Sequence, residues 1–212
     1  MTIQDAYQQF QIMPFLQLHQ LRVAAVGQLL CECFSEVTEK QEVTTALLLH
    51  DMGNILKFKL DVFPEALKPE GKEYWQVVKD SFTDKYGGQV HLATEAIARE
   101  LGVSDRVIQM IKAISFNRAK SNFESDDLAA KICTYADMRV APHGLVSLNE
   151  RLEDGRKRYQ LKGSAAGFSY AMDSYLQKIE QQLVDKSSYR PETTTNELIS
   201  ELLPTLRNVE IP

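Results

Sequence analysis

Apolar residues recur along most of this chain three and four positions apart, and alternating β-branched runs are scarce. This spacing is the period of an α-helix, so the pattern predicts an all-α protein. A long first helix is expected over 8–34, and a second over 39–50. The inner face of the first helix is expected to carry Phe15, Leu18, Val23, Val26, Leu29 and Leu30.

Glycine, proline and capping residues divide the rest of the chain. Further helices are expected, in order, over 72–86, 89–101, 104–114, 128–137, 147–159, about 168–184 and 197–207. A loop or short broken helix is expected over 61–71, loops over 142–144 and 163–167, and a threonine-rich linker over 186–196. The chain is therefore expected to form one helical domain over 8–184, followed by a linker and short C-terminal helix over 185–212. That last helix is amphipathic, and its spacing allows packing on its own domain or on a second subunit, as in a homodimer.

Composition narrows the class of protein further. The chain has 212 residues, of which 44% are hydrophobic and 25% charged, as in an ordinary globular protein with one sizeable core. A net charge of -5 argues against an extended nucleic-acid-binding surface, so an anionic ligand would need a local basic patch. No apolar run reaches the roughly 18–20 residues of a membrane span, and the N-terminus lacks the features of a secretory signal. We therefore expect a cytoplasmic protein that makes no membrane contact.

The three cysteines do not indicate a disulfide framework or a thiolate zinc site. Cys31, Cys33 and Cys133 are odd in number and lack the spacing of zinc ligands. They are expected to be reduced and mostly buried.

The dipeptide His50-Asp51 is the strongest chemical signal, because it directly follows the apolar run 43–49. Burying an unpartnered polar group costs about 2–7 kcal/mol, and burying a charge costs more, so something must satisfy this pair. A cation would do so. His19 is expected on the core face of the first helix, where an ordinary hydrogen-bonded histidine is the alternative, and Asp137 ends a later apolar helix.

A histidine on an early helix, a His-Asp doublet that ends a later one and a distant aspartate resemble the HD-domain superfamily of metal-dependent phosphohydrolases. The resemblance covers most of residues 15 to about 140. It is carried by His19-Gln20-Leu21-Arg22-Val23, by the doublet within Leu47-Leu48-Leu49-His50-Asp51-Met52-Gly53-Asn54-Ile55-Leu56-Lys57, by Tyr86-Gly87-Gly88-Gln89-Val90-His91-Leu92-Ala93, by Ala96-Ile97-Ala98-Arg99-Glu100-Leu101-Gly102 and by Tyr135-Ala136-Asp137.

This resemblance implies a centre in which one divalent ion is ligated by His19, His50, Asp51 and Asp137. Such a mixed nitrogen and oxygen set suits Mn, Fe, Co or Ni, with Zn or Mg as alternatives. The ion would lower the pKa of a bound water for attack on phosphorus, so the ligands, His50 and Asp51 above all, would be the catalytic apparatus. The implied activity is hydrolysis of a small phosphorylated substrate, a nucleotide or related phosphate ester.

The sequence also departs from the family pattern. Several branches place an acidic general acid or base shortly after the doublet, where this chain has Asn54 and Lys57. Two-metal branches add histidines; His91 is present here, but Ser115-Phe116-Asn117 stands where another is expected. We therefore expect a mononuclear centre, with His91 either supporting a metal ligand or in contact with the substrate.

Few cations are placed to bind a phosphate. Arg22 lies one helical turn after His19, and Lys57 follows Asp51 by two turns if a helix resumes there, so both are candidate substrate-binding residues. An ordinary ion-pairing role is the alternative for Arg22. Weaker candidates for the rim of the site, or for stacking on a base, are Arg139, His143, Arg151, Tyr74 and Trp75.

Two other functional hypotheses remain open as alternatives to a hydrolase. The first is a signalling or interaction module that keeps the HD-type fold and a metal ion without turnover. The second is an oxygenase on the same fold, which would need a second metal ion and more histidines than the sequence supplies.

Overall fold

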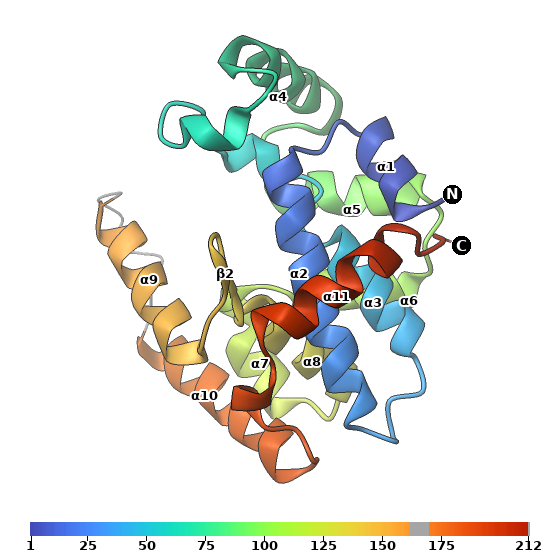
Figure 1. The fold of residues 1–212 in the computed structure, drawn as a ribbon, viewed down its shortest axis with the longest axis vertical. Coiled ribbons are helices and arrows are strands. Elements are labelled where there is room, and N and C mark those ends of the chain that lie inside the picture. The colour runs from blue at the N-terminus through green and yellow to red at the C-terminus, as the bar shows by residue number, and fades with distance from the viewer. Residues whose placement is uncertain (162–169, 212) are drawn as a thin grey trace.

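The computed structural model describes residues 1–161 and 170–211. Within these ranges the chain is all-α: it forms eleven α-helices, four short 3-10 helices (η1–η4) and one two-residue-strand hairpin (Figure 1). The α-helices are α1 (Ile3–Gln9), α2 (Pro14–Glu32), α3 (Lys40–Leu49), α4 (Lys72–Tyr86), α5 (Val90–Glu100), α6 (Asp105–Ala113), α7 (Ala119–Glu124), α8 (Leu128–Asp137), α9 (Leu148–Leu161), α10 (Tyr170–Asp185) and α11 (Asn196–Arg207).

The remaining elements are short. The 3-10 helices are η1 (Asn54–Lys57), η2 (Pro64–Leu67), η3 (Phe116–Arg118) and η4 (Pro191–Thr193). Strands β1 (Val140–Ala141) and β2 (Gly144–Leu145) pair antiparallel, with Val140 opposite Leu145. No helix in the described ranges is both long enough and apolar enough to cross a membrane. The break expected over 163–167 lies outside the described residues, as do positions 168 and 169 of the helix expected after it.

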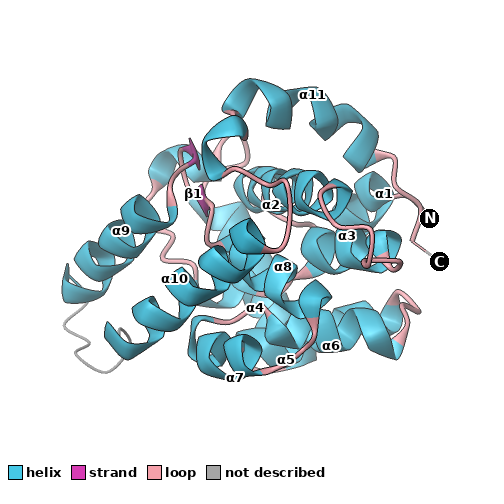
Figure 2. Cartoon of the chain, turned by 90° about the horizontal axis from the view of Figure 1, so that it is seen from below, coloured by secondary structure: helices cyan, strands magenta, loops and turns pink. Residues whose placement is uncertain are grey.

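Helix α2 lies at the centre of the fold and contacts α3, α8 and α11 (Figures 1 and 2). Its inner face buries Leu21, Val26 and Leu30 completely. Gly27 allows α3 to approach closely, because a Cβ atom built there would collide with the side chain of Leu47. This close contact sets the spacing between the C-terminal end of α3 and the middle of α2.

The long first helix expected over 8–34 is wrong at its N-terminal end. The chain leaves helical geometry after α1, takes a positive φ of 47° at Gln11, and starts α2 with Pro14 in its first turn. Proline disfavours helical geometry in the residue before it and is well accommodated at a helix start, which explains the break. The helix expected to start at 104 is capped by Ser104, and the helix of 128–137 by Asp127, as the capping residues predict.

The C-terminal segment packs on its own chain, which the spacing alone left open. Ile199 and Leu206 of α11 are buried, and α11 lies along α2. Beyond α11, the Ile3 amide donates to the Val209 carbonyl and the Ile211 amide to the Met1 carbonyl, so the two ends of the chain lie together (Figure 1). The three cysteines are free thiols, with Cys31 and Cys133 buried.

Candidate metal centre

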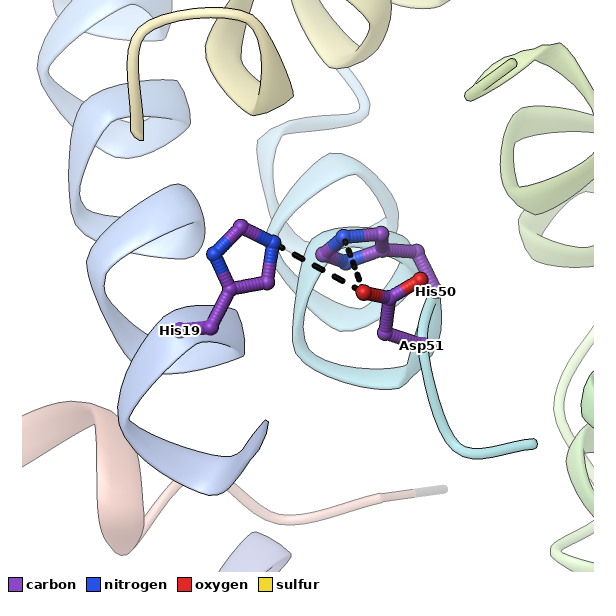
Figure 3. Close-up of side chains that lie close together, drawn as sticks. All are labelled: His19, His50 and Asp51. Atoms are coloured by element: carbon purple, nitrogen blue, oxygen red, sulfur yellow. Dashed lines mark ion pairs between the residues drawn. The ribbon is translucent and has the colours of Figure 1, made fainter. Parts of the chain in front are cut away.

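Four side chains from three helices meet at one place in the core. His19 lies on α2, His50 and Asp51 follow the last residue of α3, and Asp137 is the last residue of α8. Figure 3 shows His19 and His50 facing the Asp51 carboxylate from two sides. The structure thus brings together the four residues that the sequence singled out.

The distances between these polar atoms are short and similar. His19 Nε2 lies 3.2 Å from Asp137 Oδ1 and 3.7 Å from Asp51 Oδ2. His50 Nε2 lies 3.4 Å from Asp137 Oδ1 and 3.8 Å from Asp51 Oδ2. His19, His50 and Asp51 each offer one ligand atom within 4.8 Å of the others.

These separations fit the ligand shell of a small divalent cation. Metal–ligand bonds of about 2.1 Å place neighbouring ligand atoms about 3.0 Å apart in an octahedral site and opposite ones about 4.2 Å apart. All four imidazole-to-carboxylate distances fall between those limits. Two imidazoles and two carboxylates are a donor set typical of Mn, Fe, Co, Ni or Zn.

A backbone hydrogen bond fixes the orientation of the His50 ring. Its Nδ1 donates to the Leu47 carbonyl at 2.7 Å, which leaves the lone pair of the neutral ring on Nε2. His50 is buried, and its Nε2 makes no hydrogen bond among the described residues. A buried nitrogen that lacks a hydrogen bond and faces two carboxylates is positioned to ligate a cation.

The electrostatics of the cluster also favour a cation. Burial by itself lowers the pKa of His50, but Asp51, Asp137 and the Leu47 carbonyl outweigh it and raise that pKa to about 9. Burial raises the pKa of Asp137, but the hydrogen bond to His19 and the electrostatic attraction of the nearby His50 ring overcome this and hold that pKa well below its usual range. The Asp137 carboxylate therefore stays ionised and attracts positive charge to the space between the four side chains.

Solvent reaches this cluster from the carboxylate side. The Asp51 and Asp137 side chains keep 20% and 24% exposure, against 3% for His50. A cation held here would be protein-ligated on its imidazole side and accessible to water or to a ligand on the other.

Gln20 is a contributor to the centre that the sequence analysis did not single out. It is fully buried next to His19, and its Oε1 accepts from the Asp51 amide at 3.1 Å. Gln20 Nε2 and Asn54 Oδ1 are buried polar atoms without a hydrogen-bond partner in the described part of the chain. A polar residue on the buried face of α2 was the only available signal, and it does not identify a partner 31 positions away.

The segment after the doublet is pinned against α5. The Gly53 amide donates to the Thr94 hydroxyl at 3.0 Å, and a Cβ atom at Gly53 would lie 2.6 Å from the Val90 carbonyl oxygen. Glycine is therefore required for this close approach. This close approach places the first turn of α5, which carries His91, next to the segment that follows Asp51.

The three expected substrate-binding residues are placed differently. Arg22 is half-buried on α2 and has no hydrogen bond or ion pair within residues 1–161 and 170–211, and burial lowers its pKa. Lys57 and His91 are exposed and also unpaired within the described ranges. No hydrogen bond or ion pair links any of the three to the four residues of the centre, so their contacts with a substrate stay predictions.

The weaker candidates are engaged elsewhere or lie at the surface. Buried Arg139 donates to Val146, Tyr135, Tyr189 and Pro191, so its guanidinium ties the end of α8 to the linker. Trp75 is buried, with its Nε1 donating to the Leu67 carbonyl, and is a core residue. Tyr74 is 39% exposed, His143 is exposed, and Arg151 pairs with Asp154 at 3.5 Å.

No family model, curated protein or solved structure was found to match this chain. Function is therefore argued below from the centre itself.

Proposed function

We propose that this chain is an HD-type metal-dependent phosphohydrolase whose single divalent cation is held by His19, His50, Asp51 and Asp137. The observation that carries the proposal is the convergence of two imidazole Nε2 atoms and two carboxylates, with His50 Nε2 buried and without a hydrogen bond. Without a cation, the carboxylates would depend on protonated imidazole for compensation in a largely buried space, where an imperfectly paired charge is costly.

The bound cation would lower the pKa of a water molecule and neutralise charge on the phosphoryl oxygens. The chain itself holds His50 in the ligating tautomer through Leu47 and leaves Asp51 and Asp137 partly open to solvent. Arg22 is the best-placed phosphate anchor, because a half-buried, unpaired guanidinium one turn from His19 gains most from an anion. Lys57 and His91 are proposed to contact the substrate from the rim.

A metal-binding signalling or interaction module is the second candidate. It is favoured by Asn54, which is buried where several family branches carry an acidic catalytic residue. In that case the centre would hold its ion for structural or regulatory reasons and would lack turnover.

Phosphate release tests the two candidates. The protein is stripped of metal, resupplied separately with Mn, Fe(II), Co, Ni, Zn or Mg, and offered nucleotides, dinucleoside polyphosphates and simple phosphate esters. The hydrolase predicts metal-dependent release that Asp51→Asn abolishes and that His143→Ala, a change at an exposed histidine outside the cluster, leaves intact. Stoichiometric metal binding without turnover would favour the module, and failure to bind any metal would overturn both.

A further inference from the structure

A buried arginine holds the chain just after Asp137, the last residue of α8 and a proposed ligand of the cation. Arg139 follows it by two positions and is only 3% exposed. Burying a charged side chain is costly unless its donors are satisfied, so this guanidinium needs acceptors within the fold. Its acceptors are the carbonyl oxygens of Val146 and Pro191, at 2.7 and 3.1 Å, and the hydroxyl oxygens of Tyr135 and Tyr189, at 2.9 and 2.7 Å.

One of these contacts spans the turn that carries Asp137. Tyr135 precedes Asp137 by two positions and Arg139 follows it by two, and Arg139 Nη1 donates to the Tyr135 hydroxyl across that turn. The same hydroxyl donates to Glu180 Oε2 on α10 at 2.5 Å. Helix ends fray because their last carbonyl groups lack helical partners, and Asp137 is the last residue of α8. The bonded pair therefore fixes a turn that an unsupported helix end would leave free to move.

The linker over 186–195, between α10 and α11, holds the far side of the guanidinium (Figure 1). It supplies two of the four acceptors, Tyr189 and Pro191. The Tyr189 ring also packs edge to face against the Tyr135 ring, with centroids 6.1 Å apart at 85°. Beyond the linker, α11 lies along α2, the helix of His19. One continuous segment thus contacts the end of α8 and the helix of a second proposed ligand.

The guanidinium does not occupy the carboxylates of the centre. Arg139 forms no ion pair among the described residues, and the carboxylate of its network, Glu180, is joined to it through the Tyr135 hydroxyl. Asp137 Oδ1 instead lies 3.2 Å from His19 Nε2. Arg139 thus supports the backbone around Asp137 while leaving the Asp137 carboxylate to the centre.

We infer that Arg139 is a positioning residue for Asp137, and that the linker sets the cation affinity of the centre through Tyr189. The inference rests on the metal centre of the proposed function, and it requires neither a particular substrate nor turnover. Loss of the Tyr189 hydroxyl leaves an N–H of the buried guanidinium without its acceptor, so the guanidinium shifts and the turn of Asp137 loosens. A ligand that is oriented less firmly binds a cation less tightly.

Tyr189→Phe tests the inference, because it keeps the buried ring and removes only the hydroxyl. Titration calorimetry with Mn²⁺ should give an affinity about 10-fold below that of the wild type, the lower end of the effect of losing a contact that orients a ligand. Circular dichroism verifies that the variant is folded at the temperature of the titration. The visible absorption of bound Co²⁺ should also change, because it reports the geometry of the ligands.

Trp75→Phe is the matched control, because it also removes a buried hydrogen-bonding group. Trp75 Nε1 donates to the Leu67 carbonyl at 3.1 Å, and α4, which carries Trp75, supplies no proposed ligand. This variant should lose thermal stability while its Mn²⁺ affinity and Co²⁺ absorption match those of the wild type. Arg139→Lys, which keeps the charge but not the planar fork of donors, is the second test and should weaken Mn²⁺ binding at least as much as Tyr189→Phe.

The outcomes separate this inference from the proposed function. An unchanged Mn²⁺ affinity in Tyr189→Phe, or an equal loss in Trp75→Phe, overturns the positioning role while the metal centre stands. Absence of phosphate release from every ester, with Mn²⁺ binding that depends on Tyr189, overturns the hydrolase and supports the positioning role. A wild type that binds neither Mn²⁺ nor Co²⁺ overturns the centre and this inference together.

Discussion

His19 Nε2 lies 3.2 Å from Asp137 Oδ1, although the two residues are 118 positions apart in the chain. The contact joins α2 to α8 and adds the Asp137 carboxylate to the candidate metal centre. The two residues belong to different helices, so their contact depends on how these helices pack in the common core around α2.

The first prediction concerns cation binding by these two residues. Mn²⁺ at about 100 times its dissociation constant should stabilise the wild type by about 2.7 kcal/mol, which corresponds to a rise in Tm of about 5–10 °C for a chain of this size. His19→Ala and Asp137→Asn should each lose most of this rise, because the first lacks a ligand atom and the second lacks the negative charge of a ligand. Thermal unfolding with and without Mn²⁺ measures it. A full rise in both variants would contradict the site, and His143→Ala is the control.

The second prediction concerns Gln20 as a positioning residue for Asp51. Gln20→Leu removes the acceptor of the Asp51 amide, leaving a buried N–H unsatisfied at a cost of about 1–3 kcal/mol. Since outer contacts orient metal ligands, cation affinity should also fall about 10- to 100-fold. Gln20→Glu, which keeps an acceptor oxygen, should recover part of it. Metal titration by calorimetry or Co²⁺ absorption measures the effect.

The control for Gln20 is Gln28→Leu, a half-buried position on the same helix. An unchanged cation affinity in Gln20→Leu, or an equal loss in Gln28→Leu, would show that the contact with Asp51 does not orient this ligand.

The third prediction concerns the close approach at Gly53. A Cβ atom there would lie 2.6 Å from the Val90 oxygen and 3.0 Å from the Thr94 amide nitrogen, both backbone atoms of α5. Gly53→Ala should therefore destabilise the fold by about 1–3 kcal/mol as the segment after Asp51 shifts. Gly88→Ala, where an added Cβ meets nothing within 4 Å, is the matched control. Chemical denaturation measures both, and equal stabilities would contradict this packing.

The fourth prediction concerns acid stability. Arg106 donates to both oxygens of Asp127, at 2.7 and 2.8 Å, and also binds Glu39. Hydrogen bonding from Arg106 is the main reason that the pKa of Asp127 lies below its ordinary value of 3.8. Because the folded-state pKa is the lower one, this contribution to stability is present above about pH 3.8 and is lost as the pH falls through the folded value.

Asp127→Asn keeps a capping oxygen for α8 but removes the charge. It should cost about 1 kcal/mol near neutral pH, and the difference from the wild type should shrink below about pH 3.8. Urea unfolding at several pH values measures this, with Asp126→Asn, at an exposed neighbour, as control. A difference that stays constant with pH would show that the ion pair does not contribute.

The sequence predicted the helical class because helical spacing, glycine stops and N-caps are signals carried within a few neighbouring residues. Ser104 and Asp127 cap α6 and α8 as expected, and Gly87 follows the end of α4. Pro14 was also a local signal for a break, but the apolar pattern of α1 continues into α2 with almost unbroken helical spacing, and the prediction followed that spacing instead.

The candidate ligands also came from the sequence, through the order of His19, His50-Asp51 and Asp137 and its resemblance to a family. The sequence alone did not show that these four side chains meet, because their meeting depends on the approach of α3 to α2 at Gly27 and on the packing of α8 against both helices. The contact of Gln20 with Asp51 and the attachment of α11 to α2 were likewise decided by tertiary structure. Local sequence determines where helices begin, end and turn their apolar faces, whereas contacts between distant residues follow from how those faces pack in one core.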